Sequence, residues 1–145
     1  MAAAVLGLDG TVDPDLVAAA WETALAAPAW DGPLTWVHAD LHPANLLARH
    51  GRLAAVIDFG GLGVGDPAID MLPAWAWLTA ETRDLFRAEV GAQDATWARG
   101  RGWGLSLGLG AVHYYRVTNQ VLAAIGQHAI TQVIADFKRS ANQEA

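Results

Sequence analysis

The sequence predicts a mainly α-helical fold with a small β-hairpin, and three observations lead to this prediction. The chain has 145 residues, the size of one ordinary domain, and its 53% hydrophobic and 17% charged residues suffice for a buried core. Apolar residues recur three and four positions apart before residue 28 and after residue 66, as on one face of a helix. Between these parts the apolar runs are short and separated by glycine and proline, as in strands and turns.

The first helix is predicted between Asp13 and Pro28. Aspartate is a good N-cap, and Pro14 suits the first helical position. Apolar residues at helical spacing follow, namely Leu16, Val17, Ala20, Trp21 and Leu25. This segment is therefore expected to form one amphipathic helix.

Three short apolar runs suit strands: residues 34–37, 46–48 and 53–57. A turn over residues 49–52 separates the last two runs. A small hairpin is the simplest structure that accommodates them.

The rest of the chain is predicted to be helical. A second aspartate-proline pair at Asp66 starts a helix that continues to Trp75, with Pro73 expected to bend or break it. Further helices are predicted over residues 79–90, 94–117 and 119–137, with Gly91 and Gly126 as stops and a frayed polar tail after Arg139. Because the 94–117 segment is rich in glycine, its helicity should depend on close packing against neighbours.

Composition excludes several classes of protein. With 9 Lys+Arg against 15 Asp+Glu the net charge is -6, so neither nucleic acid nor an anionic membrane surface is an expected partner, whereas a cationic substrate would suit the chain. The absence of cysteine excludes a disulfide framework, a thiolate nucleophile and a Cys-ligated zinc, and it favours the cytoplasm. The apolar opening, residues 1–8, lacks the positive region of a signal peptide, and no apolar run reaches the length of a membrane span.

Two linked motifs indicate the chemistry. Residues 38–45 have the spacing His-x-Asp-x4-Asn of a kinase catalytic loop, and the triplet Asp58-Phe59-Gly60 follows thirteen residues after Asn45. Phosphoryl transfer from ATP needs Mg²⁺, which prefers oxygen ligands such as the Asn45 amide and the Asp58 carboxylate. Asp40 is then the candidate catalytic residue, positioning the acceptor hydroxyl.

The same region resembles the aminoglycoside phosphotransferase family of small-molecule kinases. Residues 38–45 read His-Ala-Asp-Leu-His-Pro-Ala-Asn, residues 57–60 read Ile-Asp-Phe-Gly, and residues 65–70 read Gly-Asp-Pro-Ala-Ile-Asp. The resemblance implies the C-terminal (large) lobe of a protein-kinase-like fold, with catalytic Asp40, Asn45 and Asp58 holding Mg²⁺ and ATP, and a small-molecule substrate. Two positions depart from the family pattern: Ala39 replaces a glycine, which matters if the position needs positive φ, and Gly61 replaces an acidic residue.

The resemblance also implies an N-terminal, ATP-binding lobe, for which these 145 residues show no motif. Such kinases hold the ATP phosphates with a glycine-rich turn and a lysine from an N-terminal lobe, whereas the single lysine here is Lys138. Residues 1–145 are therefore expected to be the C-terminal lobe alone, with the ATP-binding lobe absent and the chain inactive by itself. The surface left without that lobe should be apolar and could form a homodimer through residues 1–10 or 34–36.

The remaining polar residues of this region are expected first of all to have structural roles. His38 and His42 are expected to organise the loop, while Asp66 and Asp70 are expected to cap and brace the helix that begins at Pro67. For the tryptophans Trp75, Trp77, Trp97 and Trp103, packing in the core is the first expectation and lining of a ligand pocket is the second.

Two other functions and two acceptors stay open. His38, Asp40 and His42 alternate, so in a strand they would share one face and could bind a metal for hydrolysis. The chain could instead be a binding or assembly module without turnover. For a kinase, the acidic charge favours a polycationic aminoglycoside, and the tryptophans favour a bulkier antibiotic such as a macrolide.

Overall fold

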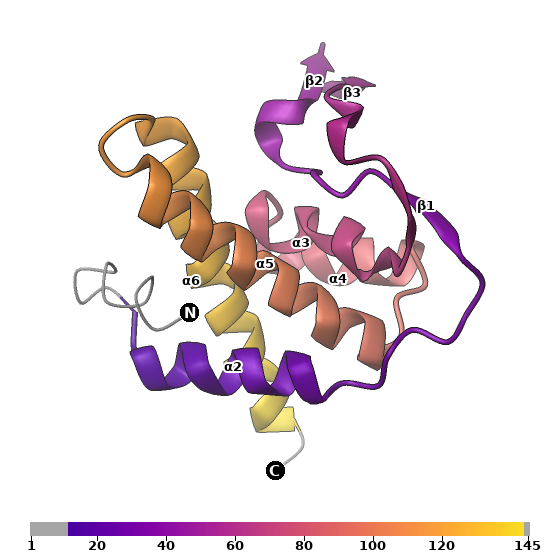
Figure 1. The fold of residues 1–145 in the computed structure, drawn as a ribbon, viewed down its shortest axis with the longest axis vertical. Helices are drawn as coiled ribbons and strands as arrows, with labels where there is room; N and C mark the ends of the chain where they lie inside the picture. Colours follow the sequence, from indigo (N-terminus) through magenta and orange to yellow (C-terminus); the bar gives the residue numbers. More distant parts are fainter. Residues whose placement is uncertain (1–11, 144–145) are drawn as a thin grey trace.

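The computed structural model describes residues 12–143 and is mostly helical (Figure 1). Its helices are α2 (Pro14–Ala26), α3 (Pro73–Ala76), α4 (Ala80–Glu89), α5 (Asp94–Tyr115) and α6 (Gln120–Gln143). Its strands are β1 (Thr35–Val37), β2 (Leu46–Arg49), β3 (Arg52–Val56) and β4 (Gly63–Gly65), and short 3-10 helices are η1 (Pro43–Asn45), η2 (Phe59–Gly61) and η3 (Pro67–Met71). The predicted mainly α-helical class with a small hairpin is confirmed.

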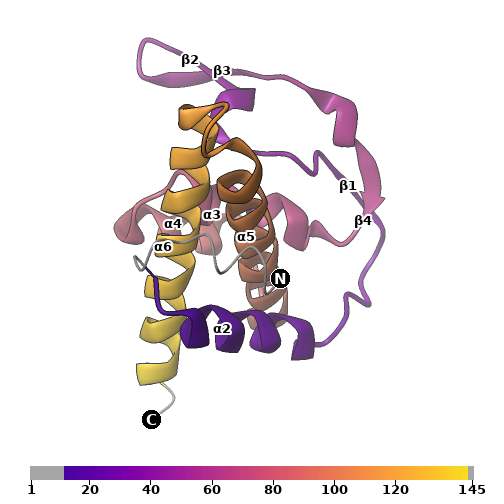
Figure 2. The same cartoon turned by 60° about the vertical axis from the view of Figure 1, so that its left-hand side comes forward.

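The two long helices α5 and α6 form the centre of the molecule, and α2 crosses them near the end that lies away from the strands (Figure 2). Where these helices meet η3 and α3, a continuous apolar core includes Trp75, Trp97, Leu105, Ile130 and Val133. Within this core the carboxylate of Asp136 is 1% exposed and accepts hydrogen bonds from the indole N–H groups of Trp75 and Trp97. Such burial of a charge requires ionic partners, which Arg83, Arg101 and Arg139 provide.

Gly126 lies inside α6 and does not end a helix, so its prediction as a stop was wrong. A Cβ on this residue would stand 2.8 Å from both the Ala111 Cβ and the Gly108 carbonyl oxygen of α5. The glycine therefore permits α5 and α6 to approach closely, whereas Gly91, with φ of 63°, does follow the end of α4 as predicted. The predicted tail after Arg139 was also wrong, because α6 continues to Gln143.

The other predicted helices are close to those observed. Asp13 caps α2 and Thr79 caps α4. The segment predicted as one helix from Asp66 to Trp75 is instead the 3-10 helix η3 followed by α3, which begins at Pro73. No helix within residues 12–143 is both long and apolar enough to cross a bilayer.

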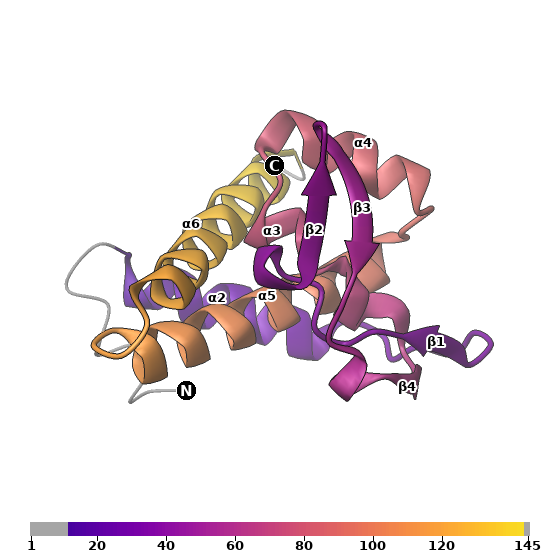
Figure 3. The same cartoon turned by 90° about the horizontal axis from the view of Figure 1, so that it is seen from above.

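The structure has two small antiparallel sheets, and Figure 3 shows the hairpin of β2 and β3 over the helices and the sheet of β1 and β4 at their side. The hairpin of β2 and β3 is the predicted one, with Leu46 opposite Val56. The second sheet was not predicted: β1 pairs with β4, whose two end residues are the glycines Gly63 and Gly65. The two sheets place residues 38–45 and 57–62 side by side above η3.

Candidate active site

Residues 38–45 connect β1 to β2, and His38 fixes this loop against the end of β3. His38 as a whole residue is 7% exposed. Nδ1 accepts a hydrogen bond from the Asp40 N–H at 3.3 Å, so Nε2 carries the proton and donates to the Ile57 carbonyl oxygen at 3.0 Å. The ring of Phe59 packs against His38 with 4.7 Å between centroids. His38 thereby links the two predicted motifs through its own side chain.

Ala39 has a φ of 66°, the left-handed conformation that glycine adopts without strain. The position of Ala39 therefore does need positive φ, and alanine is strained where a glycine would not be. Asp70 stabilises this strained position, because its Oδ2 accepts from the His38 N–H and its Oδ1 from the Ala39 N–H, both at 2.8 Å. Asp70 thus braces the loop before Asp40. The sequence had predicted instead that it would brace the helix that begins at Pro67.

Asn45 holds Asp40 by two hydrogen bonds from one amide nitrogen. Nδ2 donates to the backbone oxygen and to Oδ2 of Asp40, both at 2.9 Å. Two acceptors around one amide atom identify that atom as nitrogen and leave Oδ1 on the other side. Within residues 12–143 no group donates a hydrogen bond to Asn45 Oδ1, which is therefore available to a cation.

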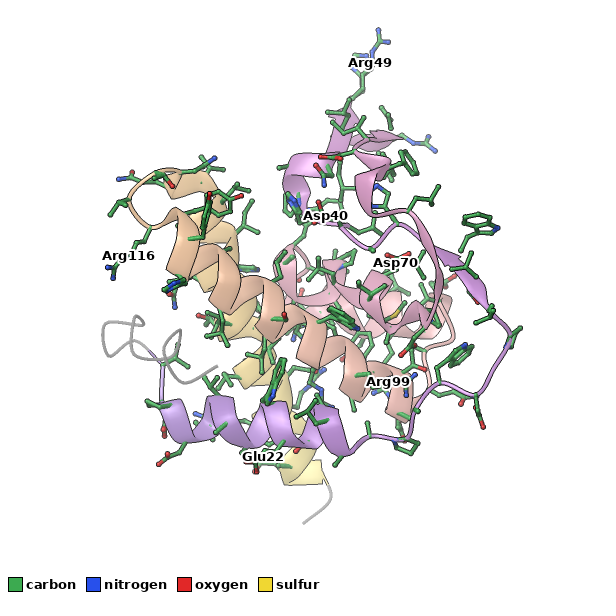
Figure 4. All side chains as sticks on the ribbon, viewed as in Figure 1. Glu22, Asp40, Arg49, Asp70, Arg99 and Arg116 are labelled. Atoms are coloured by element: carbon green, nitrogen blue, oxygen red, sulfur yellow. The ribbon has the colours of Figure 1, made fainter. Side chains whose placement is uncertain are left out.

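His42 supports the second oxygen of Asp40. Its Nδ1 accepts from the Ala44 N–H at 3.3 Å and caps η1. Its Nε2 lies 3.5 Å from Asp40 Oδ1 and 3.4 Å from Asn45 Nδ2. The Asp40 side chain is still 40% exposed. Its carboxylate is oriented by two neighbours and remains open to a ligand (Figure 4).

Asp58 follows β3 in a left-handed conformation, with φ of 61°, and its side chain caps η2. The Ile57 N–H donates to the Asn45 carbonyl oxygen at 3.0 Å. Because Ile57 directly precedes Asp58, this hydrogen bond holds the backbone at Asp58 close to Asn45. Within the described residues no hydrogen bond joins Asp58 to Asp40 or Asn45. That Asn45 and Asp58 hold one Mg²⁺ beside Asp40 therefore stays a prediction.

The available oxygens fit a hard cation such as Mg²⁺. The Asn45 amide oxygen and the exposed Asp58 carboxylate are the kinds of ligand that this ion prefers, and neither is enclosed by protein donors.

The metal-hydrolase alternative is not supported by the arrangement of His38, Asp40 and His42. Residues 38–42 form no strand, and both ring nitrogens of His38 are bonded to backbone groups. Within residues 12–143 no three His, Asp or Glu side chains are placed to hold a metal together. The predicted common face is therefore not formed.

Asp66 has the predicted capping role and a partner that sequence reasoning missed. It accepts from the Ala68 N–H at the start of η3 and from two nitrogens of Arg99, at 2.6 and 3.1 Å. Burial acts to raise the pKa of Asp66, but the hydrogen bonds from Arg99 and Ala68 outweigh it, so the pKa lies below its ordinary value. Arg99 also bonds to the Pro28 carbonyl oxygen, which ties α5 to the segment after α2.

The tryptophans divide between core and surface. Trp75 and Trp97 are buried, as predicted. Trp77 and Trp103 are 51% and 45% exposed, and each lines a different cavity, of about 550 and 430 Å³. Neither cavity is lined by Asp40, Asn45 or Asp58.

Comparison with known proteins identifies the class. Residues 2–103 match the model of the phosphotransferase enzyme family, APH. This match covers more than half of the chain, so the protein belongs to that family, whose members are phosphotransferases of the kinase-like type. No curated protein and no solved structure matches the chain.

Proposed function

We propose that this protein transfers the γ-phosphoryl group of ATP to a hydroxyl of a small molecule, with Asp40 as the catalytic residue. The observation that carries the proposal is the contact between Asn45 and Asp40, which orients the carboxylate and turns the amide oxygen outward. Membership of the phosphotransferase family supports the reaction class.

Asp40 has one task in this reaction. Its exposed carboxylate accepts a hydrogen bond from the acceptor hydroxyl and aligns that oxygen with the γ-phosphorus. The new bond joins the hydroxyl oxygen to phosphorus while the bond from phosphorus to the bridging oxygen breaks, and ADP leaves with that electron pair. The hydroxyl proton passes to Asp40 and then to solvent.

Asn45 and Asp58 are proposed to hold Mg²⁺ through the Asn45 Oδ1 and the Asp58 carboxylate. When bound, the ion neutralises charge on the phosphate oxygens. Asn45 would then have two tasks, because the same side chain orients Asp40 through its nitrogen.

We further propose that residues 1–145 act as the C-terminal lobe and bind nucleotide weakly without an ATP-binding lobe. Lys138 lies in the last turns of α6, which point away from the sheets that carry the site (Figure 1). This lysine is therefore too remote to pair with phosphates near Asp58.

Steady-state assay of ADP release tests the proposal, with the chain alone and with a separately supplied small lobe of a family member. We expect activity only with the lobe, and Asp40→Asn should reduce it by about a hundredfold or more. Asp31→Asn, an exposed change away from the site, is the matched control. Equal activity of the Asp40→Asn variant and the wild type would refute the role of Asp40.

Self-association is proposed for the exposed apolar residues of the strands and of the loops beside them. Exposed apolar side chains there are Leu34, Trp36, Leu47, Leu53, Phe59, Leu62 and Val64. An apolar surface of this kind in water favours a partner, most simply a second copy of the chain. Sedimentation at several concentrations should show a dimer that Trp36→Lys dissociates, whereas a wild-type monomer at high concentration would contradict it. The other predicted contact, residues 1–10, lies outside the described residues.

A further inference from the structure

A shallow groove of about 550 Å³ lies between the end of α3 and the first turns of α6. Trp77 lines it from one side, and Val121, Ala124, Ile125 and His128 line it from α6. Trp77 is 51% and Val121 is 69% exposed, so apolar atoms of both walls face solvent.

The groove is on the same side of the molecule as Asp40. Figures 1 and 3 show the loop between β1 and β2 above α3 and beside the first turns of α6. The contacts of Asp70 agree with this placement. Its carboxylate binds the loop at His38 and Ala39, and α3 begins only three residues later in the chain. Trp77 follows directly after α3. A small molecule in the groove would thus lie next to the proposed catalytic loop.

The residues that line the groove carry no carboxylate, although the whole chain has a net charge of -6. Residues 95–135, which include most of α5 and α6, contain no aspartate or glutamate. The arginines of that stretch, Arg99, Arg101 and Arg116, do not line the groove, so its lining is neutral where His128 is neutral. Burial and the charge of Arg83 both lower the pKa of His128, so this histidine is neutral at pH 7.

A polycationic ligand would find no counter-charge on such a wall. Aminoglycosides carry several ammonium groups, and removing each from water is costly without a carboxylate partner. An apolar ligand instead gains free energy by covering Trp77 and the aliphatic side chains of α6.

We infer that the groove binds the acceptor and that the acceptor is an alcohol with a neutral, largely apolar body, whose hydroxyl reaches Asp40. The inference rests on the proposed phosphotransferase function and narrows its substrate class. Of the two acceptors that the sequence left open, the inference favours the bulkier, less charged one over the aminoglycoside, because no acidic residue lines the groove.

Binding to the full chain tests the inference without turnover. The probes are 2-(1-naphthyl)ethanol, a neutral aromatic alcohol, and kanamycin A, a polycation, each followed by the NMR signal of the Trp77 indole N–H. We expect the alcohol to shift this signal and kanamycin to leave it unchanged at the same concentrations. Trp77→Ala should weaken binding of the alcohol, measured by calorimetry, by about tenfold, the effect of losing an aromatic contact of roughly 1.4 kcal/mol.

A matched pair of charge variants locates the site. Val121→Glu places a carboxylate in the groove and should weaken binding of the alcohol while permitting binding of kanamycin. Val117→Glu adds the same charge at an 81% exposed position that does not line the groove, and it should leave both unchanged. Tighter binding of kanamycin than of the alcohol to the wild type, or equal behaviour of the two variants, would overturn the inference.

Two further outcomes are distinguishable. A dimer that Val121→Glu dissociates, together with no binding of the alcohol, would identify the groove as an interface between copies and overturn the inference. Specific binding of the alcohol in a protein that fails to transfer phosphate even with a small lobe would refute the proposed function and leave the ligand class of the groove intact.

Discussion

Asp70 Oδ1 lies 2.8 Å from the backbone nitrogen of Ala39, the residue whose left-handed conformation turns the chain into the catalytic loop. The other oxygen of the same carboxylate bonds to the preceding N–H, of His38. One side chain of η3 therefore holds two successive peptide groups, and the position of Asp40 depends on it.

Asp70→Asn should destabilise the protein and displace the loop. The amide offers one acceptor oxygen, so one of the two N–H groups would face an NH₂ group. Loss of a hydrogen bond to a charged group predicts a decrease of about 2 kcal/mol in the free energy of unfolding, measured by urea denaturation. Asp31→Asn should change it by less than about 0.5 kcal/mol, and an equal effect of both variants would contradict the bracing role.

Ala39→Gly should stabilise the protein. A non-glycine residue in the left-handed region is strained by about 1 kcal/mol, and glycine removes that strain at some cost in chain entropy. We expect a net gain of up to about 1 kcal/mol in thermal or urea unfolding. The control Ala48→Gly, in strand β2, should lower stability by about 0.5–1 kcal/mol, so a loss at both positions would show that Ala39 is unstrained.

Sequence pattern was sufficient for α2, α4, α5 and the hairpin because their signals are local. Asp13, Pro14 and Thr79 act within a few residues of their own position, and the hairpin follows from two apolar runs around a turn. The loop motif likewise carries its own spacing, so Asp40 and Asn45 could be selected before their contact was known.

The contacts that no local pattern marks could not be predicted. Asp70 meets Ala39 from 31 residues away, and nothing in the sequence distinguishes that partner from the start of its own helix. Gly126 is ambiguous for the same reason, since a glycine both ends helices and permits two helices to approach. Only the position of α5 decides between these roles.

Gly126→Ala should destabilise the packing of α5 on α6. The added methyl group would stand 2.8 Å from a carbonyl oxygen and a methyl group of α5, and relieving such an overlap typically costs 1–3 kcal/mol. Gly110→Ala is the matched control, because nothing lies within 4 Å of the new Cβ. That variant should gain about 0.5–1 kcal/mol from helix propensity, and opposite signs for the pair are the expected result.

The ion pair of Asp66 and Arg99 predicts a pH dependence of stability. The folded-state pKa of Asp66 is lowered, so its contribution is complete above its ordinary pKa, near 4, and is lost as the pH falls through the lowered value. Asp66→Asn should therefore flatten the fall in unfolding free energy below about pH 5 relative to the wild type. Identical acid profiles of the two proteins would mean that the pair does not stabilise the fold.

The central claim is that Asn45 and Asp58 hold the metal of a nucleotide beside Asp40, and paramagnetic broadening by Mn²⁺-ATP tests it even if binding is weak. We predict selective loss of the NMR signals of the Asn45 side-chain amide and of the Asp58 to Gly60 backbone amides. Asp58→Asn should restore these signals, and Asp94→Asn, an exposed change, should not. Broadening elsewhere, or the same broadening in Asp58→Asn as in the wild type, would contradict the account.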